Sequence, residues 1–340
     1  MRQLYFTRPG ELQWREIPEP QLESDLEALV RPLAVATCDL DRMIVRGGLE
    51  LDGEFAFGHE CVAEVIDVGD AVKSASCGDL VSVPFQISCG TCAACIEGRT
   101  ANCTTVPRIS MYGLGPLSGA EWGGFFADVV RVPFADHMLL PIPVGVPPEA
   151  VACLSDNIAD AWRTVGPALE QVPGAPILIA GTEGSVGLYA AAIALALGSE
   201  RVDWVGGGEH ERNLAEQLGA TVVADSFPER LGPYPITVDA SGHQDGLTCA
   251  VRSTAPDGLC TSIGIYFDPK TSIPLLEMYT KGICFQTGRV HARSAMTRAL
   301  DLVRAGRLHP ELITGQVVGW EDAPDAVAAH ESKLVVSRAS

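Results

Sequence analysis

Four cysteines lie within the fifteen-residue segment CGTCAACIEGRTANC, with the spacing C-x2-C-x2-C-x7-C. Four thiolates from one short loop can surround a Zn²⁺ ion in a tetrahedron with no position left for water, which is typical of a structural zinc site. Disulfides or an iron–sulfur centre are alternatives, but thiols two residues apart suit one tetrahedral ion better than two strained bridges. The sequence therefore predicts a structural zinc ion bound by Cys89, Cys92, Cys95 and Cys103.

A second group of candidate metal ligands is spread along the chain. Cys38 follows the apolar, strand-like segment LVRPLAVAT, and His59 and Glu60 begin another strand-like segment. A catalytic zinc ion needs three protein ligands and an open position, and Cys38 and His59 supply two donors of suitable type. The candidate third ligand is Asp156, with Cys153 as its competitor. Taken singly, a buried cysteine, a core histidine and an aspartate at a helix N-cap would each be structural.

A glycine-rich turn lies between an apolar run and an Ala/Leu-rich segment in ILIAGTEGSVGLYAAAIALALG. Strand, glycine turn and helix in this order bring the backbone close to a pyrophosphate, which the helix N-terminus attracts. The usual register would have glycine at Thr182, so the context carries more weight than the motif. A tight turn that serves packing alone is the alternative. The sequence predicts dinucleotide binding at Gly181, Gly184, Ser185, Val186 and Gly187.

The choice between NAD and NADP depends on the end of the following strand, where an acid normally accepts the ribose hydroxyl groups of NAD. This chain has Gly206, Gly207 and Gly208 there, so no carboxylate is expected to repel a 2′-phosphate, and Arg212 could approach it. Glu209 lies between them, and Arg212 is equally well explained as a solvated helix residue. We therefore expect NADP or NAD, with a slight preference for NADP.

The elements that must position these residues are of two kinds. From residue 60 to 84, short β-branched runs alternate with Gly-Asp turns, as in a domain of antiparallel strands. From Pro176 onward, strands alternate with helices, which predicts a doubly wound parallel sheet. A helix near 294–305 and the final strands are expected to return to the first domain. The predicted strands are 176–180, 201–205, 221–224, 236–240 and 259–265, and the predicted helices of the sheet are 185–197 and 209–218.

Composition limits the partners and the compartment. The 340 residues predict about two domains, and their 47% hydrophobic content can fill two cores. The net charge of −19 repels phosphate backbones and acidic membrane surfaces, so we expect neither nucleic acid nor a membrane as partner. The N-terminal segment lacks an apolar core of signal-peptide length, and the apolar run 188–197 is too short to span a bilayer. With cysteines in no framework spacing, a soluble, cytoplasmic protein is expected.

The order of these motifs resembles that of the zinc-dependent medium-chain alcohol dehydrogenases, over nearly the whole chain. The shared motifs are Cys38, Gly58-His59-Glu60, the four-cysteine lobe, Ser155-Asp156 and Gly184-Ser185-Val186-Gly187. The resemblance implies an α/β fold in which a GroES-like, β-rich catalytic domain (1–156 and 287–340) accompanies a Rossmann domain (157–286).

The resemblance also implies roles for residues. Cys38, His59 and Asp156 would bind a catalytic zinc ion, the second ion of the chain, with water or Glu60 in the fourth position. Backbone near Ile263, with Phe285, would orient the nicotinamide, and the subunits would form homodimers or homotetramers through the Rossmann sheet. The apolar residues Met43, Met111, Trp122 and Phe125 would either line the substrate pocket or belong to the core.

The leading functional hypothesis is hydride transfer between NAD(P)(H) and an alcohol or carbonyl substrate on zinc. One departure matters: Leu40 stands where many relatives have a serine or threonine that relays the alcohol proton, and the acid Asp41 is expected to be structural. Leu40 motivates an alternative, NADPH-dependent reduction of a conjugated carbon–carbon double bond or an iminium. An alternative of another class is a non-catalytic, zinc-containing binding protein.

Overall fold

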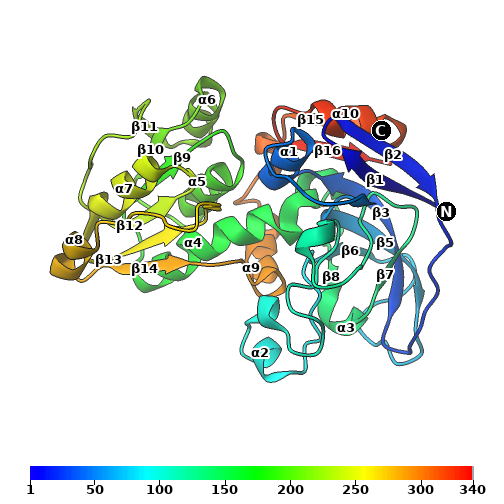
Figure 1. The fold of residues 1–340 in the computed structure, drawn as a ribbon. Coiled ribbons are helices and arrows are strands. Elements are labelled where there is room, and N and C mark those ends of the chain that lie inside the picture. The colour runs from blue at the N-terminus through cyan, green and yellow to red at the C-terminus, as the bar shows by residue number, and fades with distance from the viewer. Residues whose placement is uncertain (339–340) are drawn as a thin grey trace. The chain divides into compact units, whose positions relative to one another are not determined.

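The computed structural model describes residues 1–338, which fold into two compact units (Figure 1). The first unit comprises Met1–Ala159, His291–Leu300 and residues 314–338, and the second comprises Asp160–Val290 and Asp301–Ile313. The domain bounds given above stay a prediction, and the structure groups Asp301–Ile313 with the second unit.

The first unit contains two β-sheets. The larger has seven strands in the order β15-β16-β3-β5-β6-β8, with β7 paired to β3, and most of its neighbours run antiparallel. The expectation of short antiparallel strands between 60 and 84 is confirmed by β5 and β6. The strands are β3 (Ala28–Ala36), β5 (Glu60–Val68), β6 (Leu80–Val83), β7 (Val130–Val132), β8 (Leu140–Pro141), β15 (Gln316–Gly319) and β16 (Leu334–Ser337).

The smaller sheet has the order β2-β1-β4, and short helices connect the strands of the unit. Its strands are β1 (Arg2–Arg8), β2 (Glu11–Glu16) and β4 (Phe55–Ala56). The α-helices are α1 (Asp39–Val45), α2 (Ala93–Ile96), α3 (Ala135–Met138) and α10 (Ala323–Ala329), and 3₁₀ segments cover Thr100–Asn102, Gly115–Leu117, Pro148–Ser155 and Trp320–Asp322.

A shift of strand register in the larger sheet follows from a proline. Pro32 lacks an N–H group, and the pairing of β3 with β5 shifts register between Pro32 and Ala34. The shift lies in the strand that leads to Cys38. Between the shift and Cys38 the two strands remain paired, Val35 with Cys61 and Ala36 with Glu60. The end of β3 therefore lies beside the start of β5.

The second unit is built on a six-stranded parallel sheet in the order β11-β10-β9-β12-β13-β14, which confirms the doubly wound prediction. The chain moves outward from β9 in one direction and then restarts beside it with β12, so a topological switch point lies between these strands. The strands are β9 (Ile177–Gly181), β10 (Val202–Gly206), β11 (Thr221–Ala224), β12 (Tyr234–Asp239), β13 (Thr254–Ser262) and β14 (Cys284–Thr287).

Helices accompany this sheet (Figure 1). All five residues of β9 are buried, as expected of a parallel strand covered on both faces. Helix α6 covers the range predicted for it and ends at Gly219, whose φ of +103° is the left-handed conformation that glycine adopts without strain. The helices are α4 (Asn157–Gln171), α5 (Val186–Ala196), α6 (Glu209–Leu218), α7 (Gln244–Ser253) and α8 (Leu275–Lys281), with a 3₁₀ turn at Pro310–Ile313. Helix α9 (Ala292–Arg304) belongs to the first unit up to Leu300 and to the second from Asp301.

Helix α4 is missing from the sequence-based expectations, because its start was read only as a possible N-cap at Asp156. It begins directly after that residue and contains Pro167. None of the helices described in residues 1–338 is both long enough and apolar enough to cross a lipid bilayer.

Candidate functional site

Three residues far apart in the sequence converge within the first unit. Cys38 precedes α1, His59 precedes β5 and Asp156 precedes α4. One ligand atom from each residue, a thiol sulfur, a ring nitrogen and a carboxylate oxygen, lies within 4.8 Å of the others. Nε2 of His59 is 3.4 Å from Oδ2 of Asp156. Among residues 1–338, the competing candidate Cys153 is not part of this group.

The chemistry of the three donors fits a zinc ion. Thiolate, imidazole and carboxylate are all zinc ligands, and three protein ligands leave one position open. Burial raises the pKa of Cys38 to about 12, and the Asp41 carboxylate adds to this rise. A buried thiol of this kind loses its proton readily only when a cation binds it. We conclude that the site is suited to a divalent ion and unsuited to three ionised groups alone.

Asp41 lies behind two of these ligands. Its carboxylate is fully buried, Oδ2 accepts the backbone N–H of Cys38 over 2.9 Å, and Oδ1 is 3.3 Å from Nδ1 of His59. Burial lowers the pKa of His59, but the neighbouring Asp41, Cys38 and Asp156 outweigh it and the net pKa is raised. A carboxylate on Nδ1 leaves Nε2 available to a metal, the usual second-sphere arrangement of a zinc-bound histidine.

Glu60 points to a different set of partners. Its Oε1 accepts the backbone N–H of Asn157 over 2.9 Å, and its Oε2 accepts a hydrogen bond from Nζ of Lys333 over 2.6 Å. Lys333 also donates to Oδ1 of Asn157 over 2.7 Å. Burial raises the pKa of Glu60 to about 7 against the effect of Lys333, while Glu60 raises that of Lys333 against the effect of burial. Both oxygens of Glu60 are therefore engaged.

Sequence reasoning missed Asn157 and Lys333. Asn157 follows a candidate ligand directly, which is a weak signal. Lys333 precedes the apolar strand β16 and is 273 residues from Glu60, so no local pattern connects the two.

The four residues considered for a substrate pocket have different environments. Met111 and Trp122 line a cavity of about 280 Å³ together with Phe55. Phe125 is fully buried and packs on Tyr112 with ring centroids 4.5 Å apart, which makes it a core residue. Met43 is exposed on α1. The ring of Phe85, which the sequence did not single out, packs edge-on against His59 at 5.7 Å.

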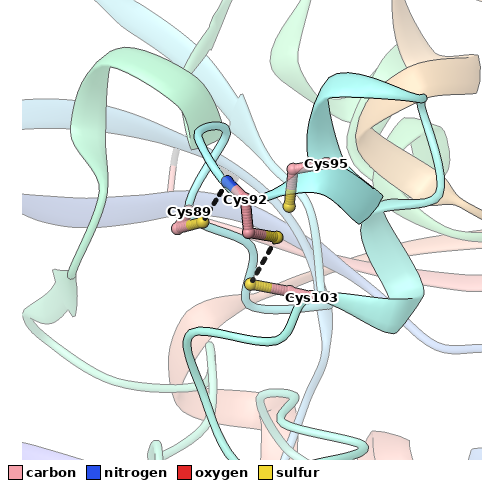
Figure 2. A group of neighbouring side chains, drawn as sticks. All are labelled: Cys89, Cys92, Cys95 and Cys103. Carbon is pink, nitrogen blue, oxygen red and sulfur yellow. Dashed lines mark hydrogen bonds between the residues drawn. The ribbon is translucent and has the colours of Figure 1, made fainter.

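The four cysteines of the lobe also converge (Figure 2). All four sulfur atoms lie within 4.8 Å of one another, and those of Cys92 and Cys103 are 3.9 Å apart. A tetrahedron with zinc–sulfur bonds of about 2.3 Å has edges of about 3.8 Å, so this separation suits zinc. The sulfur of Cys89 accepts the N–H groups of Thr91 and Cys92 and the hydroxyl of Thr105. The structure forms no disulfide within residues 1–338.

The glycine-rich turn lies in the second unit, at the carboxyl end of β9. Packing excludes a side chain at Gly181, where a β-carbon would lie 1.9 Å from the ring of Trp204. It disfavours one at Gly187, where a β-carbon would lie 3.1 Å from that ring. Ser185 precedes the first residue of α5, Val186. The turn therefore has the strand–turn–helix arrangement of a dinucleotide site. Its glycines also allow close packing against Trp204.

The remaining cofactor candidates lie on the same sheet. Gly206 and Gly207, at the end of β10, have φ values of +81° and +79°, and the Arg212 guanidinium donates a hydrogen bond to the carbonyl of Gly207. Ile263 follows β13, and its N–H binds the carbonyl of Asp239 over 2.9 Å. Phe285 lies in β14 and packs against the core.

Asp239, at the carboxyl end of β12, is a buried acid that the sequence did not single out. Its carboxylate accepts hydrogen bonds from the hydroxyl groups of Ser241, Ser262 and Tyr266 over 2.6, 2.7 and 2.8 Å. These bonds join the ends of neighbouring strands at the edge of the sheet that carries the glycine turn.

Comparison with known proteins gives the family. The model of the alcohol dehydrogenase GroES-like domain matches residues 24–144, and that of the zinc-binding dehydrogenase domain matches residues 185–305. A probable zinc-binding alcohol dehydrogenase of Mycobacterium tuberculosis is 25% identical over 98% of this chain and 86% of its own length. A glutathione-independent formaldehyde dehydrogenase of Pseudomonas aeruginosa is 34% identical, over 58% of this chain and 52% of its own.

Among solved structures, the alcohol dehydrogenase of Thermus sp. ATN1 superposes with a TM-score of 0.87 and 26% identity over 99% of both chains. The two domain models occur in the order that the motifs predicted, one over each kind of sheet. The chain therefore belongs to the medium-chain dehydrogenase/reductase family.

Proposed function

We propose that this protein is a zinc-dependent oxidoreductase that transfers hydride between NAD(P)(H) and an alcohol or carbonyl group of a small-molecule substrate. The observation that carries the proposal is the convergence of Cys38, His59 and Asp156 within 4.8 Å, in a chain of this family. Relatives named alcohol, formaldehyde and L-threonine dehydrogenases support the reaction class.

Bound in this group, zinc would act as a Lewis acid on the substrate oxygen, and the nicotinamide would supply or accept hydride. The protein holds the ligands ready for the ion. Asp41 fixes the backbone of Cys38 and faces Nδ1 of His59, so the ring is oriented before a metal binds. The lobe of Cys89, Cys92, Cys95 and Cys103 would hold a second, structural zinc ion.

The proton of an alcohol substrate needs a carrier other than Leu40, which has no hydroxyl group. We propose water or Glu60 for this step. Glu60 is the acid that follows His59, and its hydrogen bonds to Asn157 and Lys333 connect it to a polar cluster.

The test is a steady-state assay of the protein loaded with zinc. Primary and secondary alcohols should reduce NAD⁺ or NADP⁺, and carbonyl compounds should oxidise the reduced cofactor. Leu40 favours a second candidate, reduction of a conjugated double bond or an iminium. Turnover of enals or cyclic iminium ions with no response to alcohols would establish that candidate and reject the first.

A non-catalytic binding protein would behave differently in two measurements. The enzyme should contain two zinc ions per chain and should change the fluorescence of NADH or NADPH on mixing. One zinc ion per chain together with no fluorescence change for either cofactor would favour the binding protein.

The oligomeric state is proposed from the second unit. Strand β14 ends the sheet order and exposes most of its residues, and Leu275, Leu276 and Tyr279 of α8 are exposed as well. An open edge with neighbouring apolar side chains suits pairing with a second copy, so we propose a homodimer that can pair into a homotetramer. Light scattering should give a dimer or tetramer mass, and Tyr279→Asp should lower it.

We also propose a cytoplasmic location. Five of the seven proposed zinc ligands are cysteine thiols, and a reducing compartment keeps thiols reduced. Fractionation of cells that express a tagged chain tests this directly.

A further inference from the structure

The end of β10 is surrounded by acids that do not belong to the strand. Glu211, in the first turn of α6, turns its side chain back over the glycines. A β-carbon built on Gly208 would lie 2.6 Å from Oε2 of Glu211 and 3.8 Å from Oε1 of Glu183, a residue of the glycine-rich turn. Two carboxylates from separate segments therefore approach one backbone position, at the end of the strand that follows the glycine-rich turn.

Gly208 leaves this position open. A β-carbon on Gly208 would displace the Glu211 carboxylate from the place that it occupies, whereas one on Gly207 would make ordinary contact with Cβ of Glu211 at 3.6 Å. Gly207 and Gly208 thus leave space into which a carboxylate from the helix reaches. In the usual arrangement the acid is the last residue of the strand; here the same place is reached from the following helix.

The local charge opposes a phosphate group. Glu183, Glu209 and Glu211 lie around the strand end, and the cation Arg212 beside them already donates a hydrogen bond to the Gly207 carbonyl. A 2′-phosphate would meet a net negative field at short range, whereas ribose hydroxyl groups would find carboxylate acceptors.

A structural role for Glu211 is the competing explanation, since it is the third residue of α6 and an acid there stabilises a helix N-terminus. The hydrogen bonds of residues 1–338, however, include none that occupies the Glu211 carboxylate. Glu211 as a residue is only 9% exposed, and a carboxylate without such a partner can accept hydrogen bonds from a ligand.

We infer that Glu211, assisted by Glu183, selects NAD over NADP by accepting the ribose hydroxyl groups and repelling a 2′-phosphate. The inference rests on the proposed function and reverses the slight preference for NADP that the sequence alone suggested. Glu211 acts here on the cofactor, far along the chain from the proposed zinc ligands.

The experiment is a titration of the zinc-loaded protein with NADH and with NADPH, followed by the change in cofactor fluorescence, for the parent and for Glu211→Gln. The parent should bind NADH at least about 10-fold more tightly than NADPH, and Glu211→Gln should narrow this ratio about 10-fold. Glu216→Gln, an exposed acid of the same helix, is the matched control and should leave the ratio unchanged.

Two further variants test the roles of Glu183 and Arg212 in cofactor binding. Glu183→Gln should narrow the ratio less than Glu211→Gln, and Arg212→Gln should leave NADH binding within about 3-fold, since its guanidinium serves the backbone. A parent that prefers NADPH, a large loss of NADPH binding in Arg212→Gln, or an unchanged ratio in Glu211→Gln would overturn the inference while the proposed function stands. Binding of neither cofactor by the folded parent would overturn both.

Discussion

Lys333 and Glu60 form an ion pair of 2.6 Å although their side chains are only 2% and 0% exposed to solvent. Asn157 completes the cluster by binding both, so each oxygen of Glu60 has a partner. Removing one member of a buried pair leaves a charge that the interior cannot solvate, which is costlier than removing both. This pair makes the environment of the candidate metal site sensitive to a residue outside it.

Replacing Lys333 with methionine should therefore destabilise the protein by about 3–5 kcal/mol, because Glu60 loses its cation inside the first unit. Urea unfolding measures the loss. The double variant Lys333→Met with Glu60→Gln should recover part of it, since no unpaired charge remains. Equal losses in the single and double variants would show that the packing of Lys333, and not its charge, stabilises the fold.

Replacing Cys38 with serine, or Asp156 with asparagine, should remove one of the two zinc ions expected per chain and abolish turnover, because a three-ligand site loses a donor. Metal content of the purified variants, measured by plasma mass spectrometry, checks this. Cys153→Ala is the control. Cys153 is buried and close in sequence to Asp156 but lies outside the ligand group, so this variant should keep both zinc ions. A variant at Cys153 that loses a zinc ion would contradict the assignment of Asp156.

Replacing Cys95 with serine should release the zinc ion of the cysteine lobe while leaving the ligand group of Cys38 intact. The lobe has few apolar contacts of its own: its buried cluster consists of Cys89, Cys95 and Cys103, with Val106 and Phe134 packed against it. Without the ion, segment 89–103 should exchange its amide hydrogens faster and become sensitive to proteases. We expect the increase in amide exchange rate to be confined to that segment. An unchanged exchange rate would show that the lobe folds without metal.

His137 should make stability depend on pH. Nε2 of His137 is 3.0 Å from the hydroxyl of Ser88, and burial, assisted by the charge of Arg293, lowers the pKa of His137 to about 4. Between pH 6.5 and 4 the unfolded chain binds the proton and the folded chain does not, so stability falls as the pH is lowered through this window.

Because His137 is only partly buried, the loss should be about 1–2 kcal/mol. Urea unfolding at pH 7 and pH 5, for the parent and for His137→Asn, measures it. The variant should show a smaller difference between the two pH values than the parent, and an equal difference would assign the pH dependence to other groups.

The second unit could be predicted closely because its signals are local. Helix α6 and strand β11 cover the expected ranges, since Gly219 ends the helix and a β-branched run follows within two residues. The order of Cys38, His59 and Asp156 was enough to suggest one metal site, and the structure brings the three together.

Other features depend on contacts that no local pattern records. Lys333 reaches Glu60 across 273 residues, and the approach of Glu211 to Gly208 depends on how a helix leaves its strand. The end of strand β10 itself has glycine in place of an acid. Helix α4 begins directly after the candidate ligand Asp156 and contains Pro167, which weakens the helical pattern of the sequence.

Strand β16 pairs with β3, joining Val335 to Ala36, and Lys333 stands just before it. On the ribosome, Cys38, His59 and Asp156 emerge before Lys333, so the nascent chain holds the Glu60 carboxylate without its counter-ion while the 273 residues that separate the two are synthesised. The whole second unit is translated in that interval. Any metal bound by the growing chain in that interval would be held before Glu60 acquires its cation, and the complete surroundings of the ion would form only when β16 pairs with β3.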